Sequence, residues 1–267
     1  MEDSQLNQLS PNYVPEEYRT PYDVLELPSQ GILYENKKKS VKVEYLTAMD
    51  ETILTSPNIA SGSKIIDILL KRKVKDLGFD VEDLLSGDRA SLMMFLRVTS
   101  FGEEYKQMVF DPDVGEYVEA TINLTELSQK KLTIKPNELG EFEFKLPKTN
   151  RMVTFKLLTG RDEEIIDQRE TEFLKRNSEG ISNKIIFTLE QQIKSIDGER
   201  DKIKISNIIK KLPIIDSRSL RKYIEEITPG INLKTTARTN GGRSLDTFLR
   251  FGSNFFWPEL WIPFIST

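Results

Sequence analysis

The chain of 267 residues contains neither cysteine nor histidine. Without cysteine it has no disulfide, no thiolate metal site and no thiol nucleophile. Without histidine it lacks the commonest general base and the commonest metal ligand. Ser-His and Cys-His catalysis are therefore excluded, as are zinc sites made of cysteine and histidine. Only carboxylates, lysine, tyrosine, serine and threonine remain for chemistry, and we expect no cofactor.

Long apolar runs and a strong excess of one charge are also missing. No stretch approaches the ~20 apolar residues of a membrane-spanning helix, and the acidic, polar residues 1–10 are unlike a secretory signal. We therefore expect no membrane partner and a protein that stays in the compartment where it is made. The 38 basic and 42 acidic residues give a net charge of -4, which disfavours a nucleic-acid binder. A nucleic-acid accessory role stays as an alternative hypothesis.

Hydrophobic periodicity predicts an α+β fold in three parts. Residues 1–40 hold four prolines and little periodicity, which indicates an extended N-terminal arm. Residues 41–180 read as an α+β domain that contains an antiparallel sheet at about 104–158. Residues 181–267 read as a helical region that ends in a hairpin and an aromatic tail.

The elements expected within these parts follow from their patterns. In the first half we expect a strand at 41–46 and then a helix with Thr47 as its N-cap and the basic run at 71–75 at its C-terminus. A short helix at 80–85 and a buried helix at 89–100 follow. Period-two patterns predict the strands of one small sheet at 105–109, 117–123, 131–134, 141–146 and 152–158. Thr159 is expected to cap a helix at 161–176. For 181–196 both a helix and a strand near its end stay open. Helices at 203–212 and 217–227 then precede a hairpin at 233–249 that turns at 240–242.

Two polar groupings have a possible chemical meaning and a simpler one. Asp111, Asp113 and Glu116 offer the oxygen ligands that Ca²⁺ prefers, but the EF-hand spacing is absent and an acidic turn explains them. Carboxylate pairs such as Glu163-Glu164 are adjacent on a predicted helix, so they face different directions. A hydrolase that uses two carboxylates is thus a remote alternative, and we expect no enzyme activity and no small-molecule substrate.

The aromatic tail is the most unusual local feature. Phe255, Phe256, Trp257, Trp261 and Phe264 fall within ten residues, with Pro258 and Pro263 among them. Such a segment either folds back into the core of its own chain or docks on another subunit, because tryptophan and other aromatics dominate interface hot spots. The residues alone leave both interpretations open.

Several segments, in order, resemble the T4-type baseplate hub and hub-assembly proteins of contractile-tailed phages. They begin with Leu27-Pro-Ser-Gln-Gly-Ile-Leu-Tyr34, and the others lie at 41–51, 96–105, 120–127, 142–158, 196–198, 212–224, 229–233 and 255–258. Family members often carry Cys-x-x-Cys-Gly knuckles in two hairpins. At 110–115 and 239–242 this chain keeps the glycines without the cysteines, so zinc is not carried over.

The resemblance implies a structural or assembly component of a phage tail baseplate hub that acts by protein–protein binding. An assembly chaperone absent from the mature virion is the alternative. Other baseplate or tail proteins would be the partners, and the chain would be found in the host cytoplasm during assembly and in the virion tail baseplate. The residues expected to contact a partner are Leu27, Pro28 and Tyr34 in the arm, Phe255, Phe256, Trp257 and Trp261 in the tail, and Arg218, Arg221 and Tyr223.

Overall fold

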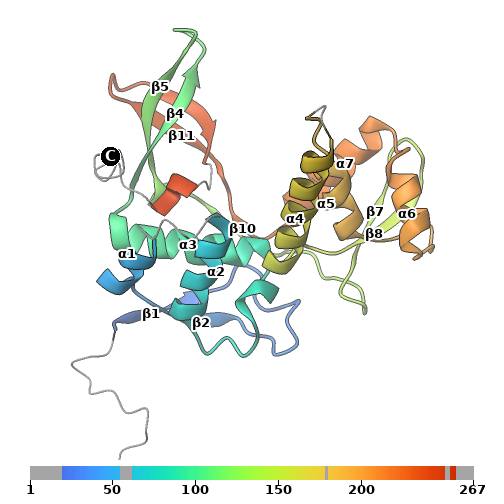
Figure 1. The fold of residues 1–267 in the computed structure, drawn as a ribbon, viewed down its shortest axis with the longest axis horizontal. Helices are drawn as coiled ribbons and strands as arrows, with labels where there is room; N and C mark the ends of the chain where they lie inside the picture. Colours follow the sequence, from blue (N-terminus) through green and yellow to red (C-terminus); the bar gives the residue numbers. More distant parts are fainter. Residues whose placement is uncertain (1–19, 55–61, 178–179, 250–252, 257–267) are drawn as a thin grey trace, which may run out of the picture.

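A computed structural model describes residues 20–54, 62–177, 180–249 and 253–256, which form two lobes (Figure 1). Of these described residues, those up to 134 and those from 230 onward form the first lobe, and those between them form the second lobe. The prediction of a mixed α+β fold is confirmed. Within the described residues, none of the helices combines the length and the apolar character needed to cross a bilayer.

Helix α3 (Ser86–Phe101) is the centre of the first lobe, as its nearly uncharged sequence predicts. Its buried residues include Leu92 and Leu96, which have no exposed surface. Around it lie α1 (Ala48–Leu54), α2 (Gly62–Lys73), the short helix η3 (Val81–Asp83) and an antiparallel sheet of β1 (Tyr22–Glu26), β2 (Ser40–Glu44) and β3 (Val74–Lys75). Part of the segment expected as an extended arm thus pairs with the rest of the lobe.

Two hairpins stand together above α3 and are called the paired hairpins (Figure 1). They are β4 (Glu104–Asp111) with β5 (Glu116–Asn123), and β11 (Lys234–Thr239) with β12 (Ser244–Phe248). One antiparallel sheet joins them in the order β12-β11-β5-β4. Their inward residues, such as Val109, Ile122 and Ala237, are buried. The helical turn η5 (Ser253–Phe256) lies between the hairpins and α3 (Figure 1).

The second lobe packs four helices with a separate three-stranded sheet. The strands are β7 (Phe142–Lys145), β8 (Met152–Phe155) and β9 (Ile193–Ile196), in that order. The helices are α4 (Gly160–Arg176), α5 (Lys184–Gln192), α6 (Lys202–Ile209) and α7 (Ile214–Ile227). Helix α4 begins with a capping box between Thr159 and Asp162, which confirms the predicted cap. The open alternatives at 181–196 both apply, because α5 runs directly into β9.

The expectation of a single sheet over 104–158 is wrong. Strand β5 pairs with β4 and with β11, which lies more than 100 residues further along the chain, whereas β8 pairs with β7 and with β9 in the other lobe. The strand expected at 131–134 is also wrong: the strand there is β6 (Gln129–Lys130), and it pairs with β10 (Gly230–Ile231). The short turn η4 (Leu124–Glu126) separates β5 from β6. Local patterns identify strands but do not select their partners.

Candidate interaction surfaces

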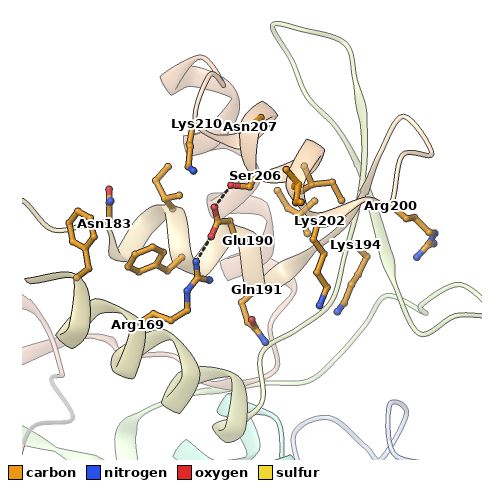
Figure 2. Close-up of a pocket in the computed structure, with 16 residues that line it drawn as sticks. Arg169, Asn183, Glu190, Gln191, Lys194, Arg200, Lys202, Ser206, Asn207 and Lys210 are labelled. Atoms are coloured by element: carbon orange, nitrogen blue, oxygen red, sulfur yellow. Dashed lines mark hydrogen bonds and ion pairs between the residues drawn. The ribbon is translucent and has the colours of Figure 1, made fainter. Parts of the chain in front are cut away.

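A groove of about 900 Å³ opens in the second lobe between α4, α5 and α6 (Figure 2). Arg169 comes from α4, Lys194 from β9, Arg200 from the turn before α6, Lys202 from the first residue of α6, and Lys210 from the residue that follows it. Against these five basic side chains the lining contains one acidic residue, Glu190. We call this surface the basic groove.

Carboxylates neutralise two of the five cations. Arg169 pairs with Glu190 at 2.6 Å, and the hydroxyl of Ser206 donates to the same carboxylate at 2.6 Å (Figure 2). Arg200 makes two hydrogen bonds of 2.8 and 2.9 Å to Glu141. The other three cations of the groove are Lys194, Lys202 and Lys210. The described residues provide no ion-pair partner for these lysines. A net positive charge therefore remains on this surface.

Lys194 lies close to the positive charges of other lysines. Burial lowers the pKa of its ammonium group, and the nearby charges of Lys156 and Lys202 lower it further, while the carboxylates of Asp162 and Glu141 offset part of this effect. In Figure 2 the side chains of Lys194 and Lys202 extend in the same direction. An anion placed between them would relieve this repulsion.

The start of α6 adds to the positive potential. The Asp201 side chain accepts a hydrogen bond from the Lys204 backbone N–H at 2.9 Å and so caps the helix. Acidic residues usually occupy the first helical turn because they suit the helix dipole, but this turn contains Lys202 and Lys204 and no acid. The N-cap carboxylate of Asp201 and the ion pair of 2.7 Å between Lys204 and Glu199 offset part of this charge, whereas the described residues provide no ion pair for Lys202.

Aliphatic surface accompanies the charges. Ile203 is 74% exposed beside the groove, and Ile186 is half-buried within it. Phe187, by contrast, is covered by the guanidinium of Arg169, which lies 4.3 Å from its ring centre. The groove therefore offers aliphatic contacts and little free aromatic surface.

A second surface lies on the outer face of the paired hairpins, near the β4–β5 turn. Met108, Phe110, Val114 and Tyr117 are each about half exposed or more, at 58, 49, 55 and 62%. Phe110 and Tyr117 are cross-strand partners and their rings meet edge to face at 5.5 Å. We call these four residues the hairpin patch. Such clustered exposed apolar side chains mark contact sites.

An ion pair between the two turns supports the hairpin patch. The fully buried carboxylate of Asp111 pairs with Arg243 from the β11–β12 turn and also accepts the Asp113 backbone N–H at 3.0 Å. This pair holds the β4–β5 turn against the β11–β12 turn. In the described part of the chain, no cluster of three or more acidic residues is placed to hold a metal ion.

A smaller hollow of about 270 Å³ between the lobes gathers four carboxylates, three of which have a hydrogen-bond or ion-pair partner. Asp67 pairs with Arg89 at 2.5 Å and Asp167 with Lys184 at 2.7 Å. Glu164 accepts from Gln168 at 3.0 Å. Burial raises the pKa of Glu163, and the nearby Ser86 and Arg89 offset part of this effect. This arrangement gives no specific support to a carboxylate hydrolase.

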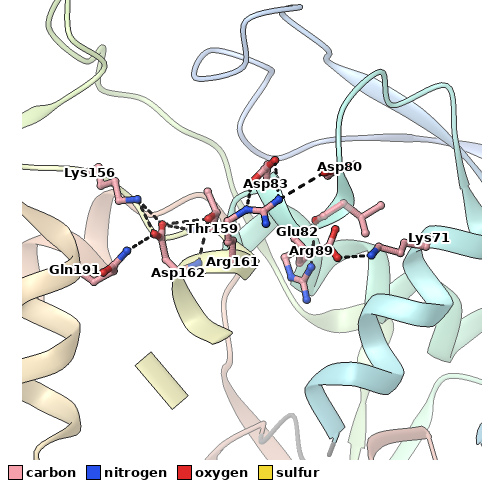
Figure 3. Close-up of polar contacts among 11 residues, drawn as sticks. Lys71, Asp80, Glu82, Asp83, Arg89, Lys156, Thr159, Arg161, Asp162 and Gln191 are labelled. Carbon is pink, nitrogen blue, oxygen red and sulfur yellow. Dashed lines mark hydrogen bonds and ion pairs between the residues drawn. The ribbon is translucent and has the colours of Figure 1, made fainter. Parts of the chain in front are cut away.

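Polar contacts also fix the junction of the lobes (Figure 3). Arg161, in the first turn of α4, binds Asp83 of the first lobe through contacts of 2.7 and 3.2 Å. Asp162 accepts from Lys156 at 2.6 Å and from Gln191 at 2.6 Å, so it ties α4 to β8 and α5. Burial alone raises the pKa of Asp162, but hydrogen bonds from Lys156, Gln191 and Thr159 outweigh it and lower the pKa. These contacts position two walls of the basic groove.

The three arm residues expected to bind a partner are all buried in the first lobe; they are Leu27, Pro28 and Tyr34. The Tyr34 hydroxyl donates to Asp88 at 2.5 Å and accepts the Leu85 N–H at 2.9 Å. Gly31, at φ +68°, would place a Cβ 2.5 Å from the Lys38 carbonyl oxygen. The Leu27–Tyr34 motif thus fastens this segment to the start of α3.

The three residues of α7 that were expected to contact a partner differ in how far their side chains are exposed. Arg218 is exposed, whereas Tyr223 is half-buried and stacks on Phe144 with ring centres 4.8 Å apart. Arg221 is half-buried and donates to the Ser217 carbonyl at 3.3 Å. Only Arg218 of these three presents its side chain fully to a partner.

The described part of the aromatic tail is core. Phe255 and Phe256 are 0 and 5% exposed. Arg97 donates to the Phe255 carbonyl at 2.8 Å, and the Phe255 ring lies 5.4 Å from that of Tyr105. Trp257 and Trp261 lie outside the described residues, so their role stays a prediction.

Neither the basic groove nor the hairpin patch is predicted by the sequence motifs. The one available signal for the groove was a first helical turn with lysines and no acid at 202–204. For the patch it was the run Met108-Val109-Phe110, which places apolar residues on both faces of β4.

Comparison with known proteins identifies the family. A family model described as T4 bacteriophage base plate protein matches residues 25–257. Searches of curated proteins and of solved structures gave no match. The matched region spans both lobes, including both surfaces described above. The chain therefore belongs to the T4 bacteriophage base plate protein family.

Proposed function

We propose that this baseplate protein is a structural or assembly component of the tail hub and that it works by binding other baseplate or tail proteins. The observation that carries this proposal is the hairpin patch, an exposed apolar cluster on a projecting pair of hairpins. Burying such a patch contributes roughly 25 cal/mol per Å² of apolar surface. Arg218, Trp257 and Trp261 are further candidate contacts.

Quantitative mass spectrometry of purified particles, tail intermediates and infected-cell lysate tests the proposal. A few copies per particle make the chain a hub building block in the virion. Abundance in intermediates with absence from particles makes it an assembly chaperone of the host cytoplasm. If the chain follows neither particles nor intermediates, the hub proposal fails.

A further inference from the structure

From the basic groove we infer a binding site for an acidic segment of a neighbouring baseplate protein, one that also carries aliphatic side chains. The inference rests on the proposed function, because it names the chemistry of one partner. Its support comes from the charge, the shape and the apolar lining of the groove.

Charge complementarity is the first support. The whole chain is acidic, with a net charge of -4, yet the groove collects five cations and one carboxylate. Lys194, Lys202 and Lys210 come from β9 and the two ends of α6, so their charges are spread along the surface. A segment with several carboxylates can meet them together.

The position of Lys202 is the second support. A cation in the first turn of a helix opposes the helix dipole, and Lys202 additionally faces the charge of Lys194. Neither arrangement stabilises the isolated chain. Both become favourable when carboxylates occupy the groove.

The apolar lining favours a protein segment over a nucleic acid. Ile203 and Ile186 offer aliphatic contacts, which suit leucine or isoleucine side chains on the acidic segment. Single-stranded nucleic acids prefer free aromatic faces for base stacking. Here Arg169 covers the ring of Phe187, and the ring of Phe173 lies edge to face against it at 5.8 Å.

Fluorescence anisotropy with the full chain tests the inference. The probe is a labelled synthetic peptide in which glutamate and leucine alternate at helical spacing. A peptide with lysine in place of glutamate and a single-stranded oligodeoxynucleotide serve as comparisons. We expect the chain to bind the glutamate peptide, to bind it more weakly at high salt, and not to bind the lysine peptide.

The diagnostic variant is Lys202→Glu/Lys210→Glu, in which both changed residues are exposed. We expect it to lower the affinity for the glutamate peptide about tenfold or more. The control Lys135→Glu/Lys145→Glu makes the same charge change at exposed positions outside the groove and should bind like the unchanged chain. Lys194→Gln gives an independent, milder reduction.

Three outcomes would overturn the inference. They are no binding of the glutamate peptide, equal losses in the diagnostic and control variants, and tighter binding of the oligodeoxynucleotide. A melting curve for each variant shows whether it is folded. Because the hub proposal is tested by incorporation into particles or intermediates, the groove inference can fail while that proposal stands.

Discussion

The hairpin patch is an apolar cluster on a projecting support, whereas the basic groove collects like charges in a concave surface. The patch gains from removing apolar surface from water, which salt does not weaken. The groove gains from neutralising lysines, which salt screens. We therefore expect contacts made through the two surfaces to respond differently to ionic strength.

The largest effect should come from breaking the support of the hairpin patch. Arg243→Ala leaves the buried carboxylate of Asp111 without its cation, and we expect a loss of about 2 kcal/mol in the free energy of unfolding. Chemical denaturation measures this, and hydrogen exchange should increase in β5 and β11. Arg238→Ala, at an exposed position of the same strand region, is the control; equal losses in both variants would show that the ion pair contributes nothing.

Asp162→Asn should loosen the walls of the basic groove. It removes the ion pair with Lys156, and we expect a cost of about 1.5 kcal/mol at neutral pH. Because folding lowers the pKa of Asp162, its stabilisation is present above the unfolded-state pKa and is lost as pH falls through the lower folded-state pKa. The difference between the two proteins should therefore shrink in acid. Asp167→Asn, whose ion pair with Lys184 is exposed, should cost little; a difference that grew in acid would contradict this account.

Removing the hairpin patch itself should change assembly far more than stability. Phe110→Ser/Tyr117→Ser alters exposed side chains, so we expect a stability change below about 1 kcal/mol. Incorporation into particles or hub intermediates should fall strongly. Leu139→Ser/Ile214→Ser removes two other exposed apolar side chains and should leave incorporation unchanged. Normal incorporation of the first variant would remove the main support for the hub proposal.

The smallest predicted effect is a change in the free energy of unfolding, and its sign tells whether Lys202 serves binding or the fold. Lys202→Glu places an acid in the first turn of α6 and should raise the free energy of unfolding by about 0.5 kcal/mol. Thermal melting checks this. A more stable chain that binds the glutamate peptide less well would show that Lys202 serves binding at the expense of stability. A destabilised chain would instead assign Lys202 a structural role.

Local sequence signals predicted much of the fold. The Thr159 cap, the apolar run of α3 and the glycines of both hairpin turns depend on neighbours close in the chain, and all lie where the sequence places them. The approach of Gly87 to Pro229, whose carbonyl oxygen would lie 1.7 Å from an added Cβ, has no local signal. Strand pairing between β5 and β11 has none either.

The candidate surfaces were harder to predict for the same reason. The five basic residues of the groove lie between positions 169 and 210, and they come from two helices, a strand and a turn. The Leu27–Tyr34 motif invited a partner-binding role, but its polar atoms bind Asp88, 59 residues from Ser29. Asp216 likewise accepts the backbone N–H groups of Lys148 and Thr149 at 2.7 and 3.1 Å. These motif residues stabilise the fold itself.

The most direct test of two separable contact surfaces is zero-length carbodiimide cross-linking of purified hub intermediates and tails, followed by mass spectrometry. This reagent joins an amine to a carboxylate only when the two already form a close pair. We predict cross-links from Lys202 or Lys210 to an aspartate or glutamate of another baseplate protein. High salt should reduce the yield of these cross-links, while the chain itself stays incorporated. Incorporation with cross-links only within the chain, or loss of the whole chain at high salt, would contradict the account.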